Sequence, residues 1–251
     1  MKLFTDTFLK RALVVLIVLA LGVGCVSSDN STKGETNMET NMETKNLPGK
    51  YANVNGLKMY YEIHGAGQPL VLLHGAFSAI GTSFGKVLPE LAKSRQVIAF
   101  EMQGHGHTAD IDRPLSYEQM ADDTVAALQQ LDIEKADFFA YSMGGAVALQ
   151  VAIRHPEMVR KLVLASGAYK LDGLHPGLME GLAEMTPEMM FGSPWHEEYI
   201  RIAPRPEDFA TLFAKVMQTD REFRDLPAET IEAIEAPTLL IIGESDIIRP
   251  A

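Results

Sequence analysis

The chain has 251 residues, of which 47% are hydrophobic and 22% are charged. This composition is typical of one globular domain with a sizeable core. The formal net charge of -11 argues against nucleic acid as a partner, because phosphate binding needs a basic surface. The single cysteine, Cys25, excludes an intramolecular disulfide and a cysteine-rich metal site.

The first 24 residues have the pattern of a signal peptide. A basic start (Lys2, Lys10 and Arg11) precedes an unbroken apolar run over residues 12–23. This run has the length of a signal-peptide core and is too short to span a bilayer comfortably. It ends in Leu-Gly-Val-Gly-Cys, which resembles a bacterial lipoprotein lipobox with Cys25 at the processing site. We therefore expect an exported lipoprotein, anchored through Cys25 at the periplasmic or cell-surface face of a membrane. The alternative is an ordinary signal peptide with an incidental cysteine.

Residues 25–46 are expected to form a flexible, lipid-anchored tether. They are rich in Ser, Asn, Thr and Glu, and they repeat Thr-Asn-Met-Glu at 36–39 and 40–43. This stretch carries too little apolar surface to fold. The folded domain should then cover residues 47–251.

Apolar runs of strand length alternate with helical patterns in the folded domain. Asn55-Gly56 separates two short runs and predicts a hairpin. Continuous apolar runs, as expected of strands buried on both faces, lie at 70–73, 97–100, 138–140, 162–165 and 238–242. The alternation predicts an α/β fold, with a mainly parallel sheet and helices on both faces.

Two helical regions stand out between the strands. The clearest helix begins at Ser116, with Gln119 at the spacing of a capping box. Residues 170–233 are rich in Met and aromatic side chains and contain no obvious buried strand, so we expect a helical cap inserted over the catalytic edge of the sheet. A lid of that composition suits a bulky apolar substrate. The alternative is that these side chains only pack the cap against the sheet.

A serine stands where a predicted strand meets a predicted helix. Residues 138–145 read Phe-Phe-Ala-Tyr-Ser-Met-Gly-Gly, so that Ser142 precedes a helix beginning with two glycines. The motif departs from G-x-S-x-G because Ala140 replaces the first glycine. A serine at such a turn projects its hydroxyl near the helix N-terminus, where it can attack a carbonyl carbon and where a developing oxyanion is stabilised.

Three further motifs follow other predicted strands: His-Gly-Ala-Phe at 74–77, Gly-His-Gly-His-Thr at 104–108 and Gly-Glu-Ser-Asp at 243–246. With Ser142, their order and spacing resemble the α/β-hydrolase superfamily, in its single-domain esterase and lactonase-like branch. The resemblance begins at Lys50 and implies the α/β-hydrolase fold. It also implies a catalytic triad of serine, histidine and a carboxylate.

The resemblance implies that Ser142 is the nucleophile and Asp246 the triad acid. Glu244 and Asp132 are acids of the same type, but their places in the pattern do not fit. The position of Met143 at the helix start makes its backbone N–H one oxyanion donor. By resemblance, the second donor is the backbone N–H of Ala76.

The remaining site expectations concern the pocket and the histidines. His74 is expected to be a scaffold residue. His105 and His107 are two apart with no carboxylate at ligand spacing, so we expect no metal there, and the resemblance implies no cofactor. His155 is expected to be structural, and a cap histidine as the triad base remains an alternative. Candidate residues of the substrate pocket are Phe77, Tyr141, Met190 and Trp195.

The triad histidine is absent from its expected place. The resemblance implies a histidine on a loop after one further strand, whereas the sequence stops at Ala251. We expect that histidine beyond residue 251, and this chain to be a C-terminally truncated hydrolase with little or no activity. The run at 238–242 would then form an apolar sheet edge, which favours aggregation. A genuinely short product is the competing interpretation.

A serine nucleophile implies hydrolysis of a carboxylic ester or lactone through an acyl-enzyme, and could also serve amide or carbon–carbon cleavage. The acidic surface weakly disfavours anions, so the expected substrate is small, uncharged and apolar. We expect a monomer. The alternative from another class is a non-catalytic, ligand-binding surface lipoprotein on the same fold.

Overall fold

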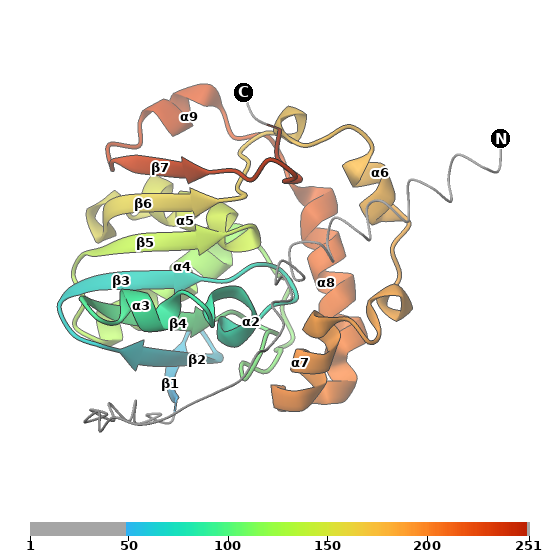
Figure 1. Cartoon of the computed structure of the whole chain (residues 1–251), viewed down its shortest axis with the longest axis horizontal. Helices are drawn as coiled ribbons and strands as arrows, with labels where there is room; N and C mark the ends of the chain where they lie inside the picture. The colour runs from blue at the N-terminus through green and yellow to red at the C-terminus, as the bar shows by residue number, and fades with distance from the viewer. Residues whose placement is uncertain (1–48, 250–251) are drawn as a thin grey trace, which may run out of the picture. The chain divides into compact units, whose positions relative to one another are not determined.

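The computed structural model describes residues 49–249, which contain a seven-stranded sheet in the order β1-β2-β4-β3-β5-β6-β7 (Figure 1). The strands are β1 (Lys50–Val54), β2 (Leu57–His64), β3 (Gln68–Leu73), β4 (Arg95–Glu101), β5 (Ala136–Tyr141), β6 (Val159–Ala165) and β7 (Thr238–Ile241). β2 pairs antiparallel with β1 and β4, and the other neighbours are parallel. The predicted mainly parallel sheet is therefore confirmed.

The predicted signal peptide, the lipidation site Cys25 and the tether lie outside the described residues. Within residues 49–249, no helix is long and apolar enough to cross a membrane.

Helices cover both faces of the sheet. α4 (Tyr117–Gln130) and α5 (Met143–Arg154) share one core cluster with Val71 and Leu73 of β3. α2 (Ile80–Phe84) and α3 (Leu88–Leu91) share a second cluster with Leu70 and Leu72. Alternate side chains of a strand point to opposite faces, so a strand covered on both faces must be continuously apolar. This confirms the interpretation of the run at 70–73.

The N-terminus of α4 has half of the predicted capping box. The Ser116 hydroxyl accepts a hydrogen bond from the Gln119 N–H at 3.1 Å. The Gln119 side chain does not return to the backbone of Ser116; it donates to Asp123 Oδ1 at 3.1 Å. Asp123 is almost fully buried and also pairs with Arg113. The Gln119 amide therefore satisfies a buried carboxylate instead of completing the capping box.

Residues 170–233 are helical, with no regular strand among them. They contain α6 (Leu178–Ala183), α7 (Pro194–Ile202), α8 (Phe209–Glu222), α9 (Ala228–Glu232) and the short turns η2 (Leu171–Gly173), η3 (Pro187–Met190) and η4 (Pro206–Asp208). Figure 1 shows α6, α7 and α8 beside the carboxyl ends of the parallel strands, whereas α9 lies beside β7. Leu226 and Ile231 pack against the main core rather than with α7 and α8.

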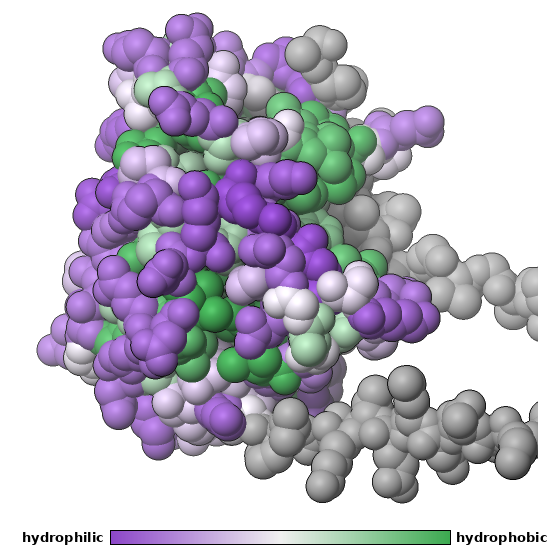
Figure 2. Space-filling view, turned by 90° about the vertical axis from the view of Figure 1, so that its left-hand side faces the viewer, coloured by the Kyte–Doolittle hydropathy of each residue, from purple (hydrophilic) through white to green (hydrophobic). Residues whose placement is uncertain are grey.

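β7 is a bare edge of the sheet. In the part of the chain that the structure describes, β6 is its only strand neighbour. Leu239, Leu240 and Ile241 are 56%, 61% and 45% exposed, so both faces of the strand are open as well. Figure 2 shows hydrophobic surface gathered on this side of the molecule at the height of β7. The predicted strand and its place at an apolar edge of the sheet are confirmed, but the expected burial of both its faces was wrong for these residues.

This edge is expected to cause self-association of the 251-residue protein, which Leu240→Lys should reduce. A charge on an exposed edge strand opposes strand pairing between molecules. Size-exclusion chromatography with light scattering at matched concentrations measures the effect. Gln218→Lys, which adds the same charge at an exposed position of α8, is the control. An equal reduction by both variants would point to net charge instead of the edge.

Candidate active site

Ser142 occupies the turn between β5 and α5 in an unusual backbone conformation. Its φ is 51° and its ψ is -118°, a region that non-glycine residues rarely adopt. Its N–H donates to the Ala165 carbonyl at 2.9 Å and its carbonyl accepts from the Gly145 N–H at 2.7 Å. The strained turn is thus held on both sides, as expected for a nucleophile raised above a sheet.

Small residues allow neighbouring segments to approach this serine. A Cβ placed on Gly75 would lie 2.9 Å from the Tyr141 ring and 3.4 Å from Ser142 Cβ. The segment carrying Ala76 therefore lies directly beside the serine. Within residues 49–249, the N–H groups of Ala76 and Met143 have no hydrogen-bond partner. Both predicted oxyanion donors are consequently free to bind an oxyanion.

Asp246 is buried in the loop after β7. Its Oδ2 accepts hydrogen bonds from the Ser166 hydroxyl at 2.6 Å and the Gly243 N–H at 3.2 Å. Its Oδ1 accepts from the Ile248 N–H at 3.1 Å. Burial, followed by the negative charge of Asp246, raises the pKa of Tyr141, the residue before Ser142. Asp246 thus lies, like Ser142, at the carboxyl ends of the parallel strands.

The other two candidate acids are placed differently. Glu244 is exposed in the loop that buries Asp246. Asp132 lies in the turn that precedes β5, whereas Ser142 follows β5, so the two are at opposite ends of that strand. The arrangement favours Asp246 over both as the partner of the serine.

His74 is a fully buried strut. Its Nδ1–H donates to the Gly75 carbonyl at 2.8 Å, and its Nε2 accepts from the Met102 N–H at 3.0 Å. Burial lowers its pKa, which keeps the ring neutral and able to accept at Nε2. His74 therefore joins the segment beside Ser142 to the loop after β4.

The loop after β4 is built around a buried carboxylate. Glu101 accepts from the Ile80 N–H at 3.2 Å and from the His107 N–H at 2.6 Å, and it pairs with His107 Nδ1 at 2.9 Å. This bond to Glu101 raises the pKa of His107, and burial opposes it. His105 is buried with Nε2 unpartnered, and burial followed by repulsion from His74 lowers its pKa to about 3. The contacts of His105 and His107 thus indicate a structural role for both rings.

The pKa values of these histidines are shifted in opposite directions, so the rings are expected to affect stability differently. His105 stays neutral when folded, so stability should fall by roughly 1.4 kcal/mol for each pH unit below about 6.5, its pKa in the unfolded chain. His74 acts in the same direction, because burial lowers its pKa as well. His107 contributes stability below the same pH and loses it as pH rises through its raised folded pKa.

Histidine NMR titration and urea unfolding between pH 5 and 8 measure these effects. We expect the His105 ring not to titrate in this range, the His74 ring to titrate below pH 6.5 and the His107 ring to titrate above it. The NMR signal that disappears in His107→Gln should be the one that titrates at the highest pH of the three. A buried ring titrating near pH 6.5 would contradict the assignment.

None of the seven histidines forms a hydrogen bond with Ser142 or Asp246 within residues 49–249. His155 pairs with Asp122 at 2.8 Å at the end of α5, and His196 lies among the aromatic rings of the cap. The backbone N–H of His175 donates to the carbonyl of Ile247, the residue after Asp246, at 3.1 Å. In this part of the chain, no group of three or more His, Cys, Asp or Glu side chains could hold a metal ion.

The four candidate pocket residues fall into two hydrophobic clusters. Phe77, Met190 and Trp195 belong to the hydrophobic cluster of the cap, where the Phe77 ring stacks on Phe213 at 5.6 Å between centroids. Tyr141 packs instead against the cluster under α2 and α3. Phe77, Met190 and Trp195 thus pack the cap against the rest of the domain.

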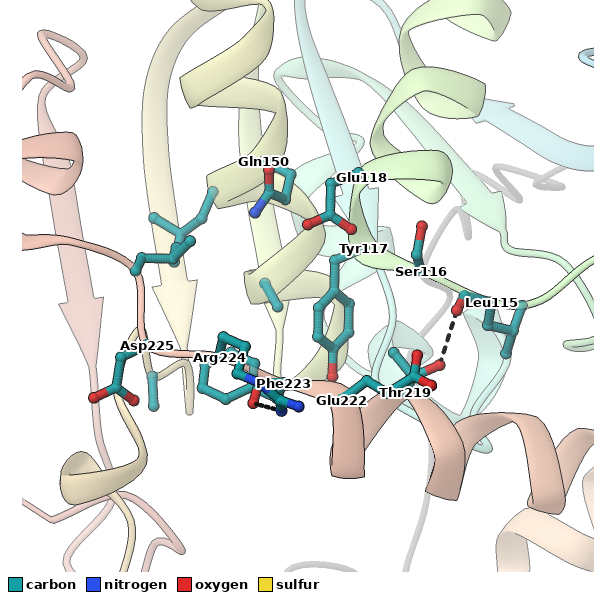
Figure 3. Close-up of a pocket in the computed structure, with 14 residues that line it drawn as sticks. Leu115, Ser116, Tyr117, Glu118, Gln150, Thr219, Glu222, Phe223, Arg224 and Asp225 are labelled. Carbon is teal, nitrogen blue, oxygen red and sulfur yellow. Dashed lines mark hydrogen bonds between the residues drawn. The ribbon is translucent and has the colours of Figure 1, made fainter.

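A pocket of about 250 Å³ lies elsewhere, between the start of α4, the side of α5 and the end of α8 (Figure 3). Tyr117, Gln150 and Phe223 line it, and the Thr219 hydroxyl at its edge donates to the Leu115 carbonyl at 3.2 Å. Its volume is below the roughly 300–1,000 Å³ that is usual for small-molecule sites. None of the predicted site residues lines it.

Two residues that matter to the site were missed from the sequence. Ser166 contacts the carboxylate of Asp246, and Glu101 organises the loop after β4. Each stands at the carboxyl end of a predicted strand. In a parallel sheet these ends meet at one edge, so a polar residue there is a signal that could have drawn attention to both.

Comparison with known proteins agrees with this geometry. Residues 68–234 match the family model described as alpha/beta hydrolase fold. A 2-hydroxymuconate semialdehyde hydrolase from Pseudomonas sp. (strain CF600) is 40% identical over 219 residues, covering 78% of this chain and 76% of the relative.

Solved structures give the same result. A meta-cleavage product hydrolase from Pseudomonas fluorescens IP01, complexed with acetates, superposes with a TM-score of 0.66 at 26% identity, covering 80% of this chain and 82% of that chain. Est816, described as an N-acyl homoserine lactone degrading enzyme, superposes with a TM-score of 0.57 at 25% identity, covering 80% and 83%. With a serine on a strained strand-to-helix turn and relatives that are named hydrolases, this chain belongs to the α/β-hydrolase fold family.

Proposed function

We propose that the protein is a serine hydrolase that cleaves a carboxylic ester or lactone through an acyl-enzyme intermediate. The observation that carries this proposal is the strained turn at Ser142, with φ 51°, flanked by the unpartnered N–H groups of Ala76 and Met143. The buried carboxylate of Asp246 on the same sheet edge supports it. Losing one oxyanion donor typically costs about 3–4 kcal/mol of activation free energy, so both N–H groups matter to the rate.

In the proposed reaction, the Ser142 oxygen attacks the carbonyl carbon while a histidine takes its proton. The carbonyl oxygen becomes an oxyanion that accepts hydrogen bonds from the N–H groups of Ala76 and Met143. The histidine then gives the proton to the departing alkoxide, leaving an acyl ester on Ser142. Water, deprotonated by the same histidine, attacks this ester, and the histidine passes the proton to the leaving Ser142 oxygen, which releases the acid and restores the serine. Asp246 stabilises the histidine whenever it is protonated.

We infer that the base is a histidine that the 251 residues do not contain. This inference rests on the separate hydrogen-bonded or packed positions of the histidines described above. The coding DNA beyond Ala251 tests it directly. A further strand pattern followed by a histidine, in frame or after one frameshift, would support the proposal. A genuine stop after Ala251 would favour the non-catalytic ligand-binding protein.

Labelling with a fluorophosphonate probe tests the nucleophile in the protein encoded by the complete reading frame. We expect one adduct, mapped to the peptide that contains Ser142 and absent in Ser142→Ala. Labelling that persists in the variant would overturn the assignment. Hydrolysis by the 251-residue protein at an ordinary enzymatic rate would overturn the expected base, and His175→Ala would then test the histidine whose backbone binds the Asp246 loop.

A second candidate reaction follows from the relative that is 40% identical, whose name gives 2-hydroxymuconate semialdehyde as its substrate. By its name this compound is an aldehyde acid and not an ester. The acidic net charge of -11 weakly favours the uncharged ester. Rates on a p-nitrophenyl ester, an N-acyl homoserine lactone and 2-hydroxymuconate semialdehyde, each compared with Ser142→Ala, decide between the candidates.

We also propose that the protein is exported and anchored through a lipid on Cys25. The Leu-Gly-Val-Gly-Cys sequence after the apolar run supports this proposal. In bacterial cells fed a clickable fatty acid, the wild-type protein should become labelled and sediment with membranes. Cys25→Ser should abolish the label. A labelled Cys25→Ser protein would contradict the lipobox assignment.

A further inference from the structure

Ser166 stands between the proposed nucleophile and the proposed acid. It directly follows β6, the strand between β5 and β7. Its N–H donates to the Ile241 carbonyl at 2.9 Å, and the preceding carbonyl, of Ala165, accepts from the Ser142 N–H at 2.9 Å. The backbone therefore places Ser166 on the sheet edge that carries Ser142 and Asp246.

The Ser166 hydroxyl makes the shortest hydrogen bond to the carboxylate of Asp246. It donates to Oδ2 at 2.6 Å, and the Gly243 N–H donates to the same oxygen at 3.2 Å. Oδ1 accepts only from the Ile248 N–H, at 3.1 Å, among the described residues. A carboxylate offers about four acceptor positions, two on each oxygen. The arrangement thus fills Oδ2 and leaves one position open on Oδ1.

The backbone at Ser166 is strained in a way that glycine would relieve. Its φ is 54°, in the left-handed region that favours glycine. The neighbouring Gly167 does not have a positive φ, so the glycine of this pair stands where its freedom is not needed. A strained residue persists when its surroundings compensate for it, and strain of this kind clusters at functional sites. In this structure, the hydrogen bond from the Ser166 hydroxyl to Asp246 compensates for the backbone strain.

We propose that Ser166 is a positioning residue of the active site, whose hydroxyl holds Asp246 so that the open position on Oδ1 faces the triad histidine. This inference rests on the proposed serine hydrolase function. Ser166 does not touch the substrate in this scheme. It acts through Asp246, by preventing rotation of the carboxylate away from the histidine.

A matched pair of variants in the protein encoded by the complete reading frame separates this role from a structural one. Ser166→Gly removes the hydroxyl and relieves the strain, whereas Ser166→Ala removes the hydroxyl and keeps the strain. We expect both to lower kcat on a p-nitrophenyl ester about 10-fold, with KM changed less than about 2-fold. The urea midpoint should fall for Ser166→Ala and stay level or rise for Ser166→Gly.

Wild-type kcat in Ser166→Gly would overturn the positioning role, whatever its stability. A loss of kcat in Ser166→Ala alone, matched by loss of folded protein, would also overturn it and leave a structural role. Ser142→Ala, assayed in parallel, separates the two levels of inference. If Ser142→Ala retains activity, the serine mechanism fails and the role of Ser166 fails with it. If Ser142→Ala is inactive while Ser166→Gly is unaffected, only the positioning role fails.

Discussion

Gly144→Ala is expected to destabilise the fold by about 3 kcal/mol or more. Gly144 is the second residue of α5 and lies immediately beside the end of β3. A Cβ there would lie 2.6 Å from the carbonyl carbon of Leu73 and 2.8 Å from the carbonyl oxygen of His74, and closer still to the Leu73 oxygen. These are backbone atoms of the last residue of a central strand and of the residue after it, so they cannot rotate away as a side chain could. The helix would have to move off the sheet.

Gly145→Ala is the matched control, one residue along the same helix. Its added Cβ would meet Gly167 Cα at 3.5 Å, an ordinary contact. Alanine is also the better helix former, by about 1 kcal/mol. Urea unfolding should therefore show Gly145→Ala near or above the wild type and Gly144→Ala far below it. Equal stability of the two variants would mean that α5 does not approach β3 as closely as described.

The same close approach connects stability with the proposed chemistry. Moving α5 outward would carry the Met143 N–H away from Ser142 and its oxyanion position. Any folded fraction of Gly144→Ala is thus expected to be a poor catalyst as well as a marginal protein. Gly144 is thus required for the close approach of α5 to β3, whereas Gly145 is not. Their adjacent places in the sequence do not reveal this difference.

Local rules predicted the parts of the fold that depend on local structure. Asn55 and Gly56 both adopt positive φ, as the hairpin interpretation required. Ser142 follows a strand and precedes a helix, as its flanking residues indicated. The order of the strands was not predictable in the same way, because the antiparallel pairing of β2 with β4 depends on contacts distant in the sequence.

The misses at the site have a common physical cause. Hydrophobic patterns report how much apolar surface a segment offers, not what covers it. The run at 238–242 therefore indicated a strand correctly, and the expected truncation indicated its edge position, but the pattern also suggested burial of both faces, which are exposed. Likewise, the positive φ of Ser166 and the burial of Glu101 arise from tertiary contacts. The sequence also could not show which pocket candidates pack in the cap cluster, because an aromatic residue there gives the same pattern whether it packs or binds a substrate.

Asp246→Asn is expected to lower kcat/KM by about four orders of magnitude in the protein encoded by the complete reading frame. Three donors surround this carboxylate: the Ser166 hydroxyl, the Gly243 N–H and the Ile248 N–H. Asparagine has one acceptor oxygen, so its NH2 group would face at least one of these donors. Asparagine also lacks the charge that stabilises a protonated histidine during serine attack.

Glu244→Gln makes the same chemical change two residues away, at an exposed position of the same loop. It should stay within about 2-fold of the wild type, because a solvated charge contributes little. Initial rates on a p-nitrophenyl ester, normalised to folded protein by circular dichroism, measure both variants. A large loss in Glu244→Gln with little change in Asp246→Asn would transfer the role of the acid to Glu244. Such a result would also remove the reason for Ser166 to hold Asp246, so these two variants test the acid and its positioning residue together.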